Sequence, residues 1–81
     1  MNTRQLQYAI MLAKVRNFSQ VADKLNITQP ALSKHILTLE KELGFPVFDR
    51  GKRGLVPTPK GIDTIAHAKR IMESYRQMTD S

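Results

Sequence analysis

Several polar side chains near the middle of the chain have the types and spacing needed to hydrogen bond with the edges of DNA bases. Gln29 is followed four and five positions later by Ser33 and Lys34. A glutamine amide can pair with adenine through two hydrogen bonds, a lysine ammonium can donate to guanine O6 and N7, and a serine hydroxyl can take either role. Pro30 and Ala31 offer apolar surface to a thymine methyl group. The alternative is that these polar groups only hydrate an exposed face.

Base reading requires these groups to lie at the start of a helix, because that end enters the groove. Thr28 is a good N-cap, and Pro30 falls in the first turn, where a missing N–H costs nothing. Gly44 is a typical residue to follow the last turn. The inward-facing apolar side chains repeat at steps of four, three and four: Leu32, Ile36, Leu39 and Leu43. The pattern therefore predicts a helix over residues 29–43 with a polar outer face.

A second helix signal precedes this one at very short distance. Ser19 is the expected N-cap of a helix over residues 20–25, and Asn26 is a good residue to end it. Two helices joined by so tight a turn must cross steeply, which predicts a helix-turn-helix whose second helix fits the DNA major groove. Free first-turn amides bind anions, so we expect Ser19 and Thr28 to lie against phosphates. The alternative is that Ser19 and Thr28 only cap their helices and do not contact phosphates.

A basic hairpin is expected after the second helix of this motif. Two short apolar runs at residues 47–48 and 55–56 flank a turn bracketed by two glycines, which predicts a β-hairpin, or wing. Its cations are Arg50, Lys52 and Arg53. We expect them to contact phosphates or the minor groove, with Arg53 at the tip entering that groove. An ordinary hydrated turn is the alternative.

The two remaining helices carry more apolar surface than one small core can cover. A helix over residues 3–15, with Thr3 as its expected cap, has two apolar stripes. A longer helix over residues 59–78 begins at Thr58 and Pro59 and has a long apolar stripe. Both helices are therefore expected to contact something beyond their own core.

Composition narrows the function. The 81 residues make one small domain, and 13 Lys or Arg against 7 Asp or Glu give a net charge of +6, which favours nucleic acid or an anionic membrane surface. Cysteine is absent, so disulfides and thiol chemistry are excluded, and His35 and His67 have no metal-ligand spacing. We expect no cofactor and no metal. No apolar run approaches membrane-spanning length and no signal peptide is recognisable, so we expect a cytoplasmic protein.

The full order of motifs resembles the N-terminal DNA-binding domain of LysR-type bacterial transcriptional regulators. The matching residues are Phe18, Ala22, the run 28–33, Leu39, Glu40, Leu43, Gly44, the run 47–50, Thr58 and Gly61. The resemblance implies a mostly α fold. A winged helix-turn-helix of three helices and a two-stranded β wing would occupy residues 1–58, and a dimerisation linker helix residues 59–81. It also implies a separate C-terminal effector-binding domain that this chain lacks.

The resemblance further implies how the surfaces are used. Gln29, Pro30, Ser33 and Lys34 match the base-reading face, and the chain would bind a partly palindromic operator as a homodimer. The expected dimer contacts are Tyr8, Met11, Leu12, Val15, Ile62, Ile65, Met72 and Tyr75. One departure concerns positions that are often basic or amide in the family and are here His35, Leu37 and Thr38. Phosphate attraction would then depend more on the wing.

Other classes of function receive less support from the sequence. A protein-interaction module would need an apolar patch on the reading helix, and Leu37 is the only hint of one. An enzyme is not indicated, because the sequence offers no nucleophile–base pair, paired carboxylates or phosphate-binding glycine loop. Membrane binding by the last helix is a further alternative. The polar face of this helix has mixed charge, whereas the polar face of a helix that lies on a membrane is usually basic, so this alternative is not favoured.

Overall fold

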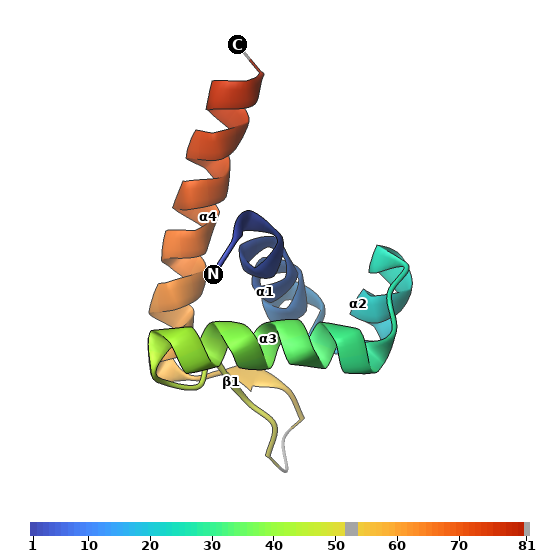
Figure 1. Ribbon diagram of the computed structural model, residues 1–81. Coiled ribbons are helices and arrows are strands. Elements are labelled where there is room, and N and C mark those ends of the chain that lie inside the picture. The colour runs from blue at the N-terminus through green and yellow to red at the C-terminus, as the bar shows by residue number, and fades with distance from the viewer. Residues whose placement is uncertain (52–53, 81) are drawn as a thin grey trace.

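The computed structural model describes residues 1–51 and 54–80. The elements run in the order α1 (Thr3–Val15), α2 (Phe18–Leu25), α3 (Gln29–Leu43), β1 (Phe48–Asp49), β2 (Val56–Pro57) and α4 (Pro59–Thr79). Figure 1 shows α2 crossing the start of α3, the hairpin hanging below α3, and α4 rising beside α1 until its C-terminal half stands clear of the other elements. The expected winged helix-turn-helix is confirmed. None of the described helices is both long and apolar enough to cross a membrane.

Two helix starts and two helix ends lie where the sequence predicts them, and one of these ends is Asn26, which follows α2 with a φ of 56°. The Thr28 hydroxyl accepts a hydrogen bond from the Ala31 amide at 3.2 Å, and the Thr58 hydroxyl accepts one from the Gly61 amide at 2.9 Å. Each threonine therefore caps its helix. Gly44 ends α3 with a φ of 84°, a left-handed conformation that glycine adopts without steric strain.

The predicted caps of α1 and α2 were wrong by one and two residues. Asn2, not Thr3, caps α1 by accepting from the Gln5 amide at 2.8 Å. Asn17, not Ser19, caps α2 by accepting from the Gln20 amide at 2.9 Å. Asparagine is a better N-cap than threonine, which favours Asn2 over Thr3. Asparagine and serine are equally good caps, and Asn17 is used because α2 begins at Phe18. As a result, the Ser19 hydroxyl is not used to cap α2.

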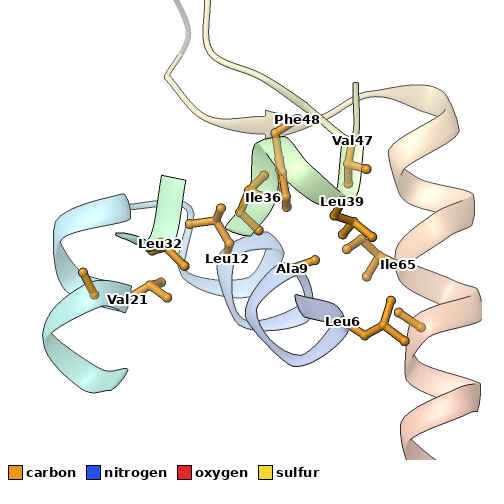
Figure 2. Packing of buried hydrophobic residues seen from close by; sticks show 12 residues of the cluster. Leu6, Ala9, Leu12, Val21, Leu32, Ile36, Leu39, Val47, Phe48 and Ile65 are labelled. Atoms are coloured by element: carbon orange, nitrogen blue, oxygen red, sulfur yellow. The ribbon is translucent and has the colours of Figure 1, made fainter. Parts of the chain in front are cut away.

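One core holds α1, α2, α3, the hairpin and the first half of α4 together. Its members are Leu6, Ala9, Leu12, Val21, Ala22, Leu32, Ile36, Leu39, Val47, Phe48, Ile65 and Ala68 (Figure 2). The inward stripe of α3 is thus confirmed for Leu32, Ile36 and Leu39. Leu12 and Ile65 are 0% and 7% exposed, so assigning them to a dimer surface was wrong. They lie on the faces along which α1 and α4 pack within one chain.

The hairpin is fixed to both neighbouring helices. β1 and β2 are antiparallel, with Phe48 opposite Pro57 and Asp49 opposite Val56. The Glu40 carboxylate of α3 accepts from the amides of Val47 at 2.7 Å and Phe48 at 3.1 Å. The wing therefore has a defined position relative to α3, the helix expected to read DNA.

Candidate nucleic-acid interface

The outer face at the start of α3 is open to solvent. Gln29, Pro30 and Lys34 are exposed and Ser33 is half-buried, so none of the four predicted base-reading residues is covered by another part of the fold. Lys34 forms no ion pair with any residue of the described segments, which leaves its ammonium available. The face continues as a shallow groove of about 380 Å³. The groove is lined by Pro30, Ser33, Lys34, Leu37, Thr38 and Lys41.

The three positions that depart from the family pattern differ in their surroundings. Leu37 is 54% exposed and lies within the groove of α3. The Thr38 hydroxyl donates to the Lys34 carbonyl oxygen at 2.9 Å, so its hydrogen bonds within its own helix. The His35 ring meets the Tyr8 ring edge-on at 5.3 Å and is half-buried. His35 therefore packs on α1, and only Leu37 and Thr38 extend the outer face.

Arg50 connects the wing to both helices of the helix-turn-helix. Its guanidinium carbon lies 4.5 Å from the centre of the Phe18 ring, and its Nη1 donates to the Ser33 hydroxyl at 3.4 Å. An arginine over an aromatic face is attracted by the partial negative charge that the quadrupole of the ring places on that face. The sequence pointed to Phe18 only as one of the residues that carry the family resemblance, and it did not predict this role. The other two predicted wing cations, Lys52 and Arg53, lie outside the described residues.

The starts of α2 and α3 are joined by a side-chain hydrogen bond that the sequence analysis did not predict. Ser19 is the second residue of α2, and its hydroxyl donates to Gln29 Oε1 at 3.0 Å. Both side chains are exposed. Thr28 lies next to Gln29 and uses its hydroxyl for capping. Ser19, Thr28 and Gln29 therefore lie together on the same edge of the molecule as the open face of α3.

A second, larger concavity lies between α1 and α4. It has a volume of about 900 Å³ and is mainly apolar. Five of the residues predicted for a dimer surface line it: Tyr8, Met11, Val15, Met72 and Tyr75. Ile62 is 60% exposed but is not part of this lining. The open apolar groove is thus distinct from the face of α3, and it includes the part of α4 that rises above the core (Figure 1).

Two of the charged residues that line this groove, Glu73 and Arg76, pair along α4. Three further lining residues form no ion pair with the described part of the chain: Lys14, Lys24 and Lys69. Arg76 binds Glu73 at 2.7 Å and Asp80 at 3.0 Å, both on its own helix. Hydrogen bonding from Arg76 lowers the pKa of the Glu73 carboxyl, and the same bond raises the pKa of Arg76. Pairs at this helical spacing stabilise an exposed helix modestly. Because the charges of Glu73 and Arg76 are paired within α4, the main feature that this surface offers to a partner is its apolar groove.

Comparison with known proteins identifies the family. Residues 3–62 match the model described as "Bacterial regulatory helix-turn-helix protein, lysR family". The chain is 39% identical to the nitrogen assimilation regulatory protein nac of Escherichia coli (strain K12), over 95% of this chain and 25% of that protein. It is 37% identical to the transcriptional regulator BenM of Acinetobacter baylyi, over 96% of this chain and 26% of BenM. The chain therefore spans about a quarter of the length of these relatives.

Solved structures agree with this assignment. The BenM DNA-binding domain in complex with catB site 1 DNA superimposes with a TM-score of 0.93 at 36% identity, covering 99% of this chain and 86% of that one. The CbnR DNA-binding domain in complex with DNA superimposes with a TM-score of 0.92 at 32% identity, covering 99% and 92%. The family consists of regulatory proteins rather than enzymes. From its sequence and its fold, this chain belongs to the lysR family of bacterial regulatory helix-turn-helix proteins.

Proposed function

We propose that this chain binds double-stranded DNA sequence-specifically, as the DNA-binding part of a cytoplasmic transcriptional regulator. The observation that carries the proposal is the open outer face of α3, where Gln29, Pro30, Ser33 and Lys34 are accessible beside the Arg50 guanidinium. In this arrangement α3 lies in the major groove and these four side chains meet base edges. The BenM and CbnR domains, which share this fold, were solved in complex with DNA, and this likeness supports DNA binding by the present chain.

The groups around the outer face of α3 are suited to bind phosphates. Arg50 supplies a cation held against α2 and α3, and the wing residues Lys52 and Arg53 add two more positive charges. The first-turn amides near Ser19 and Thr28 are suited to anions. These contacts position the domain on DNA but carry no sequence information, so they are expected to act equally on all duplexes.

The groove between α1 and α4 fits a homodimer formed through the linker helix. Its apolar lining includes Tyr75, which is 45% exposed in one chain. Exposed Ile62 adds to the apolar surface of α4. A dimer would place two reading helices on two half-sites of a partly palindromic operator, about 34 Å or a multiple of that apart. A small-molecule effector would act through a further domain outside this chain, in keeping with the length of the relatives.

Selection of bound duplexes from a randomised pool tests the proposal. We expect a two-fold symmetric consensus. Lys34→Ala should flatten the base preference at one position in each half-site. Lys52→Ala should instead weaken all duplexes alike and reduce the salt dependence by about 0.9 log units per log unit of salt concentration for the phosphate it neutralises. An unchanged consensus with Lys34→Ala would count against base reading by α3.

Salt dependence also separates this function from protein docking, for which the exposed Leu37 is the supporting observation. A DNA-binding surface releases counterions, so affinity must fall steeply as salt concentration rises. Docking of an apolar partner on Leu37 would tolerate salt. Binding to DNA that stays constant from low to high salt would contradict the proposal.

A further inference from the structure

The hydrogen bond between Ser19 and Gln29 links α2 to the first residue of α3, ten positions later in the chain. Its existence depends on the cap of α2. Because Asn17 accepts from the Gln20 amide, the Ser19 hydroxyl is not needed at the helix start. It is free to donate its one hydrogen to Gln29 Oε1, at 3.0 Å.

This bond determines which end of the Gln29 amide faces away from the protein. An amide side chain has an accepting oxygen and a donating nitrogen of almost the same shape, so an unrestrained glutamine can present either. Here the oxygen is held toward Ser19, and Nε2 has no hydrogen-bond partner among the described residues. Its two hydrogens are therefore directed outward, and Oε1 keeps a second lone pair.

The resulting pattern of donor and acceptor matches one base edge. Adenine presents an N7 acceptor and an N6 donor in the major groove, whereas guanine presents two acceptors. A glutamine that donates from Nε2 and accepts at Oε1 satisfies both adenine groups. The fixed amide also loses less side-chain freedom when it binds, because part of that freedom is already lost.

We infer that Ser19 is a positioning residue whose hydroxyl orients the Gln29 amide so that Gln29 selects adenine at one base pair of each half-site. The inference rests on the proposed function of α3. It also revises the expected role of Ser19, because a hydroxyl whose one hydrogen goes to Gln29 cannot donate that hydrogen to a phosphate. Any phosphate contact of Ser19 would come from its backbone amide.

The test begins with the whole chain and a randomised duplex pool, from which the wild type yields a consensus and Gln29→Ala identifies the base pair that Gln29 reads. Affinities are then measured by fluorescence anisotropy for the consensus duplex and for duplexes changed at that pair. Ser19→Ala should weaken binding to the adenine duplex by about threefold to tenfold, the net worth of one hydrogen bond. Binding to the duplexes changed at that pair should stay the same. Ser19→Thr should restore the preference, because it restores a hydroxyl.

A double variant and a neighbouring control complete the design. Ser19→Ala combined with Gln29→Ala should bind no more weakly than Gln29→Ala alone, since the hydroxyl acts only through that amide. Gln20→Ala, the next exposed position on α2, should leave the base preference unchanged. Thermal melting of Ser19→Ala confirms that the variant is folded, as expected for an exposed side chain.

The possible failures are distinguishable. If the wild type selects no consensus, the proposed function fails and the inference fails with it. If the wild type selects a consensus that Ser19→Ala leaves unchanged at every position, only the inference is overturned. A loss that is equal for all duplexes, accompanied by a smaller salt dependence, would assign the Ser19 hydroxyl to a phosphate and also overturn the inference.

Discussion

Gly61 lies where the first turn of α4 meets the backbone that leads into the wing. A Cβ atom at this position would overlap the carbonyl oxygen of Val47 and contact the Thr58 hydroxyl. The Val47 oxygen also accepts from the Thr58 amide at 2.9 Å, so it cannot move away without losing that bond. The glycine is required here by close packing of backbone on backbone.

We therefore predict that Gly61→Ala destabilises the domain by about 1–3 kcal/mol, the usual range for overpacking a well-filled site. For a domain of this size each kcal/mol corresponds to about 4–8 °C in melting temperature. Circular dichroism melting measures the change. Ser74→Ala, a small change at an exposed position of the same helix, is the control and should melt like the wild type. An equally stable Gly61→Ala would contradict the packing described for this turn.

At the residue scale, the sequence predicted an N-cap correctly where one candidate residue was available, and it chose the wrong residue where two candidates lay close together. Thr28 was found because the other good cap residue nearby, Asn26, already ends α2. Asn17 and Ser19 are both good caps two positions apart, and propensity alone does not separate them. The contacts of Phe18 with Arg50 and of Ser19 with Gln29 depend on how α2 crosses α3, which no local pattern specifies.

At the element scale, Glu40 decides how the wing sits on α3. Its carboxylate is half-buried and accepts from two successive amides at the start of β1. Bonds to a charged acceptor are stronger than neutral ones, and a buried amide without a partner is unfavourable. The position of Arg50, two residues beyond Phe48, follows from this attachment.

Replacing Glu40 by Ala should lower the free energy of unfolding by about 1–3 kcal/mol, because two amides lose their acceptor. Urea denaturation checks this value. Glu40→Gln keeps one accepting oxygen and should recover part of the loss. DNA affinity of the folded Glu40→Ala variant should also fall, since Arg50 would no longer be held beside α3. Stability equal to the wild type would show that the carboxylate does not hold the wing.

The sequence predicted the helices well, but it did not predict for every apolar residue whether that residue faces the core. The ends of α3 follow from Thr28 and Gly44, and the hairpin follows from its two apolar runs. Leu12 and Ile65 were assigned to a partner chain, yet both are buried within one chain. Periodicity shows that two stripes exist on a helix, but the choice between them depends on where the neighbouring helices lie.

At the scale of the whole molecule, the chain combines a net positive charge with an open apolar groove. Its net charge of +6 favours DNA. The groove between α1 and α4 shares no lining residue with the groove on the face of α3. Exposed apolar surface of this kind marks an interaction site. Two copies joined there would double the number of DNA contacts without changing either reading face.

Tyr75→Asp should therefore convert the proposed dimer to a monomer, because it places a charge within the apolar groove. Sedimentation velocity measures the change. Binding to a duplex with two half-sites should weaken much more than binding to a duplex with one. Ser74→Asp adds the same charge at a position that does not line the groove, and should leave the dimer intact. A Tyr75→Asp variant that remains dimeric would place the dimer contact elsewhere.

The most direct test of the central claim is to locate α3 on DNA with a tethered cleavage reagent. The chain has no cysteine, so a single introduced thiol carries an iron chelate at one defined site. With the reagent on Lys41→Cys, in the groove of α3, we predict cuts confined to each half-site of the selected duplex. With the reagent on Asp80→Cys, at the far end of α4, the half-sites should stay uncut. Cuts within the half-sites from Asp80→Cys, and none from Lys41→Cys, would contradict the account.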